Sequence, residues 1–547
     1  MSLETAQASP NKGGGLSYKW KVLISVIFGI FMVILDTTIV NIAFRTLQEE
    51  FAAGVNESQW IISIYVLALG ISTPLSGFLG DRFGMKRTYV TGLGIFILGS
   101  FLCGIAPSLW LLIGARTLQG FGGGIALPLG TALLFSAFPP KEQGTALGIF
   151  GIAIVTAPAL GPILGGYLVD LGLWRWIFFV NIPIGLLGIG LGIWWLRTQE
   201  RQADLSLDLW GLIASTAGFG SILYASSIAA DQGWLAPRVL IFFAVGVVGL
   251  IAFGLIELFV AKKPLLDLRL FRSRIFANAA FVGWVSVVAL FGAEFLLPLY
   301  LQVLRGRTAL ETGFILLPLA IAAAIATPVA GRLYDSIGAR PLVVLGFTIL
   351  AVNTWQLSKL TLDTSIPWIL FLLALRGLAL GLTVQTTLVT ALATVEGPKV
   401  SRASALINST RQVVQSLAVA FLATVLTASL APGLASRMEQ YQQQAPSAAT
   451  QLGANAGTST AATGTEGTPA LCNLPNSNLP LPANAKSDIS TFCQEYIVGF
   501  ERAYQWTFYA ALLALLLGAF LPGWPFHWEG RENVAGGAQP AVAAGHD

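Results

Sequence analysis

Three ionisable residues lie inside long apolar stretches of the sequence, where a charge is expensive. They are Asp36, Arg116 and Glu294. A charged side chain at the centre of a membrane-spanning helix costs about 2.5–3.5 kcal/mol on insertion scales, so residues of this kind usually have a functional task. These three are therefore the first candidates for proton exchange or for binding a charged small molecule.

Asp36 lies deep in the first apolar stretch, within Leu-Asp-Thr-Thr-Ile-Val-Asn. A low dielectric favours the protonated carboxyl, whereas a nearby cation or water favours the carboxylate, and this balance suits a group that takes up and releases a proton. A structural aspartate that joins helices by hydrogen bonds would give the same pattern. Glu294 could bind a cationic substrate or the proton, or could act as a snorkelling or capping residue.

Arg116 has no acidic residue in its own apolar stretch and needs an acceptor on a neighbouring helix. The sequence does not identify that acceptor. Arg376 and Arg411 pose the same question in later stretches, and basic residues that line a cavity could instead hold an anionic lipid or substrate. Glu257 lies near the predicted cytoplasmic end of its stretch and is interpreted as an interfacial residue.

No group of residues in the sequence predicts an enzyme, a bound cofactor or a metal site. A GxxxxGK[ST] phosphate loop is absent, and the two histidines, His527 and His546, stand near the end of the chain. Three cysteines are too few for a disulfide framework and lack metal-ligand spacing. Cys472 and Cys493 share one long polar segment, where they form either a disulfide or two free thiols.

The composition predicts an all-helical polytopic membrane protein. The chain has 547 residues, of which 55% are hydrophobic and only 11% are charged, and its mean hydropathy is +0.73. These values lie outside the range of soluble globular domains. The small net charge of +4 is spread over loops and does not indicate a nucleic-acid partner.

Fourteen apolar segments follow one another along the chain and are candidate transmembrane helices. They span about 20–44, 58–79, 88–106, 109–134, 143–168, 176–196, 207–229, 239–260, 276–302, 312–331, 340–359, 367–392, 403–430 and 503–525.

Lysine and arginine in alternate loops set the predicted orientation, because such loops tend to be cytoplasmic. Lys12, Lys19 and Lys21 place the N-terminal tail inside, and alternation then places both termini in the cytoplasm and the spans in the cytoplasmic (inner) membrane. Arg305 and Arg307 are the one basic pair on the outer side. The segment 431–500 falls outside, and its composition up to Ser490 predicts a largely disordered loop. The stretch from Phe492 to Trp506 is interpreted as an amphipathic entry to the last span.

The turn between the second and third stretches runs from Gly77 to Arg87 and is both charged and rich in glycine. Gly77 suits a close approach of two helices, and Gly84 suits a tight reversal with a positive φ. Asp81, Arg82 and Arg87 are predicted to form a cytoplasmic gate.

This turn has a second copy, which indicates an internal repeat. Pro74, Gly77, Asp81 and Gly84 recur in the same order and spacing as Pro328, Gly331, Asp335 and Gly338. The repeat divides the chain into a tail at 1–19, six helices at 20–196, two inserted helices at 207–260, six helices at 276–525 and a tail at 526–547. Repeated halves of this kind predict a binding site between them, near the middle of the bilayer.

The fifth stretch is unusually rich in helix-disturbing residues, namely Pro158, Gly161, Pro162, Gly165 and Gly166. Helix breakers survive in membranes where neighbouring groups satisfy the freed carbonyls, and small residues let another helix pack closely. The stretch is therefore predicted to be a kinked helix that either moves during function or serves only for packing.

Taken together, these motifs resemble the major facilitator superfamily, specifically its fourteen-span drug:proton antiporter branch. The resemblance rests on five segments. They are the turn at Gly77–Arg87, the first-helix motif around Asp36, the fourth-helix motif Arg116–Gly120, the fifth-helix motif Gly161–Gly166 and the segment from Trp174 to Pro183. The resemblance covers nearly all of 20–521. It departs locally, for example at Phe44, where the branch usually has proline.

The resemblance implies a fold of two six-helix bundles plus two inserted helices. It also implies that Asp36 is a proton or cation site, that Arg116 assists proton transfer, that Asp81, Arg82 and Arg87 form a cytoplasmic latch, and that the fifth helix favours export. The expected activity is proton-coupled export of amphipathic or cationic drugs by alternating access.

Other activities stay open at this stage. They are export of a dedicated endogenous metabolite, siderophore or lipid, and a non-transport membrane receptor. The expected partners are the small-molecule substrate, protons and membrane lipids, with a periplasmic adaptor protein as a further candidate at the external loop.

Overall fold

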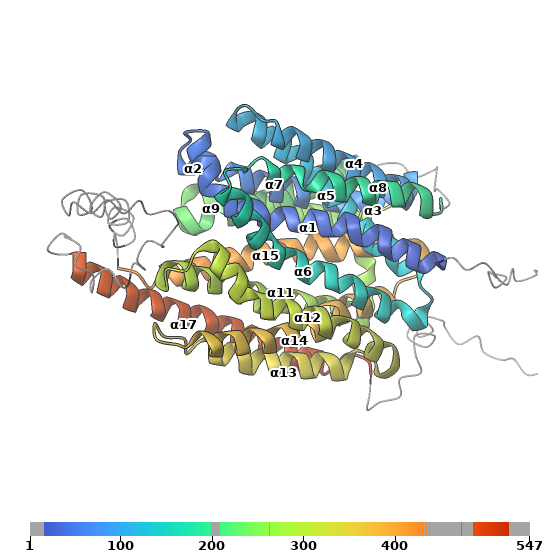
Figure 1. The fold of residues 1–547 in the computed structure, drawn as a ribbon. Coiled ribbons are helices and arrows are strands. Elements are labelled where there is room, and N and C mark those ends of the chain that lie inside the picture. The colour runs from blue at the N-terminus through green and yellow to red at the C-terminus, as the bar shows by residue number, and fades with distance from the viewer. Residues whose placement is uncertain are drawn as a thin grey trace, which may run out of the picture.

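In the computed structural model the chain is a bundle of long helices (Figure 1). The structure describes residues 16–198, 208–261, 263–431, 434, 437, 472 and 485–523, apart from the side chains at 45, 55, 56, 230, 231, 290–294 and 309. These ranges contain no β-strand beyond one isolated bridge between Gly338 and Gly523. Most of the predicted tails and of the loop at 431–500 lies outside the described residues.

The described helices correspond to the predicted apolar stretches in chain order. The first set comprises α1 (Tyr18–Glu50), α2 (Val55–Ser58), α3 (Trp60–Phe83), α4 (Met85–Gly104), α5 (Leu109–Ala137), α6 (Gln143–Asp170), α7 (Trp176–Phe179) and α8 (Asn181–Trp195). The inserted pair is α9 (Leu209–Gln232) and α10 (Pro237–Leu255), which continues as a π-helix over Ile256–Val260. The second set comprises α11 (Arg274–Leu299), α12 (Ala309–Ile337), α13 (Ala339–Leu357), α14 (Ile366–Ala393), α15 (Val400–Thr427) and α17 (Ala485–Gly518).

Eleven helices among the described residues are long and apolar enough to cross a membrane. The chain is therefore a multi-pass membrane protein. The remaining candidates are α11, which gives two shorter apolar pieces, α13 and α17. A total of fourteen spans stays a prediction.

The last helix begins much earlier than the sequence indicated. The prediction of an external loop up to residue 500 is wrong for its last part, because α17 is continuous from Ala485. The amphipathic entry predicted over 492–506 is confirmed as part of this helix. Its first turns carry a buried apolar face at helical spacing. That face consists of Ile489, Phe492, Cys493, Tyr496 and Phe500.

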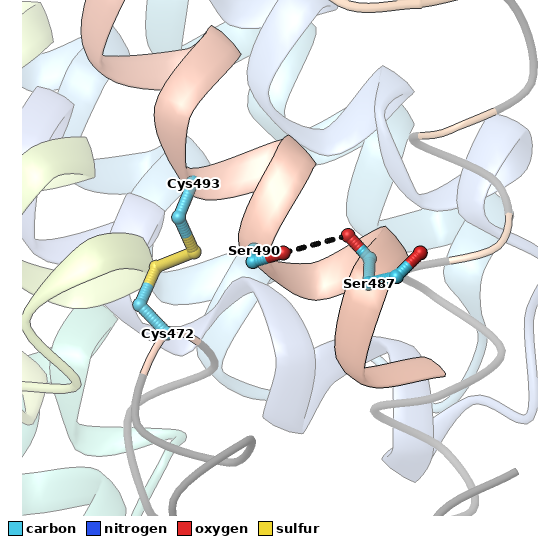
Figure 2. The surroundings of a disulfide bond; sticks show 4 residues. All are labelled: Cys472, Ser487, Ser490 and Cys493. Carbon is cyan, nitrogen blue, oxygen red and sulfur yellow. Dashed lines mark hydrogen bonds between the residues drawn. A yellow bond between two sulfur atoms is a disulfide. The ribbon is translucent and has the colours of Figure 1, made fainter. Parts of the chain in front are cut away.

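A disulfide joins Cys472 to Cys493 near the start of α17 (Figure 2). The two Cα atoms are 6.0 Å apart. Of the two alternatives left open by the sequence, the structure contains the bridged one. Cys103, in α4, is a free thiol and is buried.

Replacing Cys472 and Cys493 with serine is expected to lower the free energy of unfolding by about 3 kcal/mol, because the bond closes a loop between residues that are 21 positions apart. Thermal unfolding in detergent measures the difference. Reductant should destabilise the wild type and leave the double variant unaffected. Equal unfolding temperatures for the wild type and the double variant, both measured without reductant, would contradict this expectation.

Small residues fix α5 against α3 and α4, and this places the side chains described below. A Cβ atom at Gly120 would lie 2.4 Å from the carbonyl oxygen of Tyr65 in α3, and one at Gly122 would lie 2.4 Å from the amide nitrogen of Phe96 in α4. Any larger residue at either position would push the helices apart. The glycines therefore hold the three backbones in contact.

The two sets of helices meet along α6 and α12 and again where α3 contacts α15. In Figure 1, α6 and α15 lie near the middle of the bundle, between α1 and the helices α11 to α14. The inserted helix α9 also contacts both sets, because it packs against α3 and α15. The Trp234 indole after α9 donates a hydrogen bond of 2.8 Å to Thr424 in α15.

Candidate functional site

Asp36 is the centre of a buried polar cluster in the first set of helices. Its Oδ2 accepts a hydrogen bond of 2.5 Å from Nη1 of Arg116 in α5. Its Oδ1 accepts hydrogen bonds of 2.8 Å from Nε2 of Gln119 in α5 and from Nδ2 of Asn181 in α8. Asp36 is 0% exposed. We call Asp36, Ser100, Arg116, Gln119 and Asn181 the Asp36 cluster.

The Arg116 guanidinium has further partners besides the carboxylate. Nη1 also donates to Oε1 of Gln119 at 2.7 Å, and Nε donates to the carbonyl oxygen of Ile61 at 3.2 Å. Its Cζ lies 4.1 Å from the ring centroid of Tyr65, a cation–π contact. A buried ion pair needs such additional contacts, since the attraction between the two charges alone does not offset their desolvation.

Local structure brings the two amide side chains to the carboxylate. Gln119 follows Arg116 by three positions and therefore lies on the same face of α5. Asn181 is the first residue of α8, directly after the break at Val180 that separates α7 from α8. Asn181 also donates to the hydroxyl of Ser100 at 3.1 Å, and that hydroxyl donates to the carbonyl oxygen of Phe178 at 2.8 Å. The cluster thus ties α1, α4, α5 and α8 together.

The sequence placed Asp36, Arg116 and Glu294 around one site between the two sets of helices. The structure brings Asp36 and Arg116 together inside the first set, where both are sealed from solvent. Glu294 belongs to α11 in the second set, and its side chain lies outside the described residues. The acceptor that the sequence could not name for Arg116 is Asp36.

Arg376 occupies the matching place in the second set, on α14. It is 0% exposed, and its Nη2 donates a hydrogen bond of 2.6 Å to the carbonyl oxygen of Ala289 in α11. Nη1 lies 3.3 Å from the Thr354 hydroxyl and 3.5 Å from Oδ1 of Asn353, both in α13. Each set therefore buries one arginine that bridges three of its own helices.

Arg411 lies on α15 and lines a cavity bounded by α11, α14 and α15. Trp284 and Thr387 line the same cavity. The Trp284 indole donates a hydrogen bond of 3.0 Å to Thr410, which keeps the ring at the cavity wall. The cavity measures only about 20 Å³, close to the space of one water molecule, so in this conformation it does not hold an amphipathic molecule.

The predicted gate residue Asp81 forms a latch between the two sets. Its Oδ2 accepts a hydrogen bond of 2.6 Å from Nε of Arg402, and its Oδ1 accepts one from the Ser401 hydroxyl. Both donors lie in the first turn of α15. Gly77, one turn away on α3, allows this contact, because a Cβ there would lie 3.0 Å from the Cα of Arg402.

Asp335 forms the corresponding latch from the second set back to the first. Its carboxylate accepts hydrogen bonds from the backbone amides of Gly144 and Thr145, at 2.9 and 2.8 Å, and from the Thr145 hydroxyl at 2.7 Å. These groups form the N-terminus of α6, where a negative charge is favourable. The close approach again needs a glycine, since a Cβ at Gly331 would lie 2.3 Å from the Gly144 carbonyl oxygen.

Asp81 pairs with an arginine that the sequence did not assign to the gate. The ion pair uses Arg402 of α15. Arg82 has its guanidinium 6.0 and 5.7 Å from the ring centroids of Phe78 and Phe83, and Arg87 is exposed. The assignment of Arg82 and Arg87 to the gate stays a prediction.

Gly84 and Gly338 end the two helices that carry the latches. Their φ angles are +91° and +81°, so both positions adopt the backbone conformation that favours glycine. The positive φ predicted for Gly84 is present, and its repeat copy shares it.

The proline- and glycine-rich stretch becomes α6, which contains Pro158 and Pro162 without interruption. A Cβ at Gly161 would lie 2.1 Å from the Thr38 hydroxyl of α1, and one at Gly165 would lie 3.0 Å from the Ile39 carbonyl oxygen. Gly166 instead lies nearest to Leu310 of α12. The helix therefore packs closely on both sets, which its small residues permit.

Sequence reasoning missed several residues that complete these sites, among them Ser100, Gln119, Asn181, Ser401 and Arg402. Gln119 and Asn181 did stand in the segments quoted for the resemblance, and an amide in an apolar stretch could have marked each of them. Arg402 had been counted only as a loop charge, since no local pattern connects it to Asp81.

Residues 26–419 match the Major Facilitator Superfamily. The chain belongs to this superfamily. Superfamily membership and the transporter relatives identify it as a membrane transporter and not an enzyme. The likeness also agrees with the two sets of helices and with the paired latches between them.

Curated relatives and solved structures extend the comparison. The chain is 33% identical over 72% of its length to the multidrug resistance protein B homolog of Mycobacterium tuberculosis strain H37Rv, covering 73% of that protein. It is 30% identical over 76% of its length to the fatty acid resistance protein FarB of Neisseria gonorrhoeae, covering 82% of it. The crystallised superfamily symporter XylE shares the fold, with a TM-score of 0.57 over 92% of this chain and 96% of XylE at 13% identity.

Proposed function

We propose that this transporter is a proton-coupled antiporter that exports amphipathic, often cationic, compounds by alternating access. The observation that carries the proposal is the Asp36 cluster, a carboxylate 0% exposed that is held by one guanidinium and two amides. A relative named for multidrug resistance supports the substrate class.

Proton exchange at Asp36 follows from competition between a proton and Arg116 for the same carboxylate. A bound proton removes the negative charge and weakens the ion pair, since the protonated carboxyl no longer attracts the guanidinium. Arg116 then keeps Gln119, the Ile61 carbonyl and the Tyr65 ring as partners. Because the ion pair joins α1 to α5, its loss alters how these helices pack, which is a route from protonation to movement.

The latches explain how access could alternate. Asp81 and Asp335 both close the seam between the two sets at the end that the sequence predicts to be cytoplasmic, so this conformation corresponds to a transporter closed toward the cytoplasm. Opening that end requires both latches to separate. Each latch stands beside a glycine, Gly77 or Gly331, at which the two helices are in close contact. The hydrogen bonds of the latch are therefore lost when the helices move apart.

We further propose that the transporter lies in the cytoplasmic membrane with both termini in the cytoplasm. The disulfide between Cys472 and Cys493 supports this orientation, since disulfides persist in oxidising compartments outside the cytoplasm. Protons and membrane lipids are the expected partners. The external loop that contains Cys472 is the place where a periplasmic adaptor would bind.

Export of an amphipathic acid is the second candidate function. A relative is named for fatty acid resistance, and Arg411 and Trp284 line a small cavity that would have to widen before it could hold such an acid. The two candidates differ in the sign of the charge on the substrate, which an assay can resolve.

Inverted membrane vesicles that contain the full chain test the proposal. An amphipathic cationic dye is expected to accumulate in the vesicles against its concentration gradient only under an imposed pH gradient, acidic inside. Accumulation should stop when a protonophore is added. A fatty acid tested in parallel would replace the dye as substrate under the second candidate. Dye accumulation that persists after the gradient has collapsed would contradict proton coupling.

A further inference from the structure

Glu257, interpreted from the sequence as interfacial, is instead buried at the end of α10. It is 1% exposed and lies in the π-helical segment Ile256–Val260. Its Oε1 accepts a hydrogen bond of 3.0 Å from the Leu265 amide, and the Leu266 amide also lies close to the carboxyl group. Its Oε2 is buried and has no hydrogen-bond partner among the described residues. A buried carboxyl oxygen without a partner is costly and indicates a missing ligand or proton.

A second carboxyl group that also has a buried oxygen without a hydrogen-bond partner lies beside Glu257. Asp208 caps α9, with Oδ1 accepting a hydrogen bond of 2.9 Å from the Gly211 amide. Its Oδ2 is buried and, within the described residues, also lacks a partner. The two carboxyls flank Gly211, because a Cβ there would lie 2.4 Å from Oδ2 of Asp208 and 3.2 Å from Oε1 of Glu257.

The charges around this pair are unbalanced. Among the described residues, the charged groups that act on Glu257 are Asp208 and Arg402. Arg402 is already bound to Asp81 at 2.6 Å in the latch. Two carboxylates this close repel each other when both are ionised, and a shared proton removes one of the charges.

We propose that Asp208 and Glu257 form a proton-binding site in which one proton is shared between the two carboxyl groups. The proton comes from water and returns to water, so the step needs no other reactant. A protonated oxygen also becomes a donor, which gives one of the unpartnered oxygens a hydrogen bond. A metal cation suits the site less well, because it requires more oxygen ligands than the pair supplies.

The position of the site connects it to the Asp81 latch. Loss of the shared proton adds a negative charge that acts on Arg402 and competes with Asp81 for it. Proton binding therefore strengthens the latch and proton release weakens it. This consequence for transport rests on the proposed function, whereas proton binding itself does not.

Infrared difference spectra of the purified full-length protein test proton binding directly. The wild type is expected to show a band of a protonated carboxyl that Glu257→Gln and Asp208→Asn both lose. Asparagine is a good helix cap, so Asp208→Asn preserves the start of α9. Glu501→Gln, at an exposed position on α17, is the control and should keep the band. An unchanged spectrum in Glu257→Gln across the pH range would overturn the proposal.

A second measurement follows the latch and requires no transport. Ala405 faces Gly77 across the seam, so the thiol in Ala405→Cys reports separation of α3 from α15. Because the thiolate is the species that reacts, its labelling rate is divided by that of a free thiol at the same pH. This ratio is expected to rise with pH, and Glu257→Gln should abolish that rise. A dependence of the same size in Glu257→Gln would contradict the connection. If Glu257→Gln does not fold, Asp208→Asn decides both measurements.

Discussion

Asp36→Asn is expected to reduce proton-driven efflux to the rate of vesicles that lack the protein, while the chain remains folded. Asparagine carries no charge, so a proton can no longer compete with Arg116 for position 36. The substitution leaves a guanidinium without its carboxylate, a loss that costs about 3–5 kcal/mol when a buried pair is broken outright. Arg116 keeps Gln119 and Ile61 as acceptors, which places the cost toward the lower end.

Dye efflux in inverted vesicles and size-exclusion chromatography together measure this outcome. Asp170→Asn is the matched control, since Asp170 is exposed at the end of α6. Downhill exchange of dye without a pH gradient should survive in Asp36→Asn, because it needs no proton. Gradient-driven efflux at the wild-type rate in Asp36→Asn would remove Asp36 from the mechanism.

Gly331→Val is expected to abolish transport for a different reason, since it prevents the seam from closing. The new Cβ would lie 2.3 Å from the carbonyl oxygen of Gly144 and 3.0 Å from the Cα of Gly148. Both are backbone atoms, so the helices α6 and α12 must move apart. Overpacking of this kind costs about 1–3 kcal/mol, and the displacement also separates Asp335 from the N-terminus of α6.

Gly94→Val provides the control for this substitution, because no atom lies within 4 Å of a Cβ at Gly94. Gly94→Val makes the same chemical change within a helix, but its new side chain does not collide with a neighbouring helix. This variant should retain transport. Labelling of a cysteine introduced at Thr145 reports the opening of the latch. Transport at the wild-type rate in Gly331→Val would show that this end need not close.

The residues of the Asp36 cluster and of the two latches show how much of the site could be predicted from the sequence. Asp36, Arg116, Asp81 and Asp335 were identified individually, because a charge in an apolar stretch and a repeated motif are local signals. Their partners were harder to identify. Asp36 and Arg116 are 80 positions apart, and Asp81 and Arg402 are 321 apart. No local periodicity carries such a pairing.

The helices were predictable for the same physical reason. Each apolar stretch is long enough to cross a membrane, and the backbone must be satisfied within the helix. The prediction failed at the first turns of α17, whose polar residues face away from the buried side of Phe492 and Tyr496. The prediction that Glu257 is interfacial also failed. Its carboxyl group is buried because the segment after α10 folds back and brings the Leu265 amide to it, and no local pattern shows that fold.

In antiport, protons enter as substrate leaves, and both flows can be measured in one preparation. The purified transporter is reconstituted in liposomes that contain a pH indicator, and a substrate gradient is imposed without a proton gradient. Protons are expected to move opposite to the substrate in the wild type and not to move in Asp36→Asn. Substrate movement without proton movement in the wild type, or movement of both in the same direction, would contradict it.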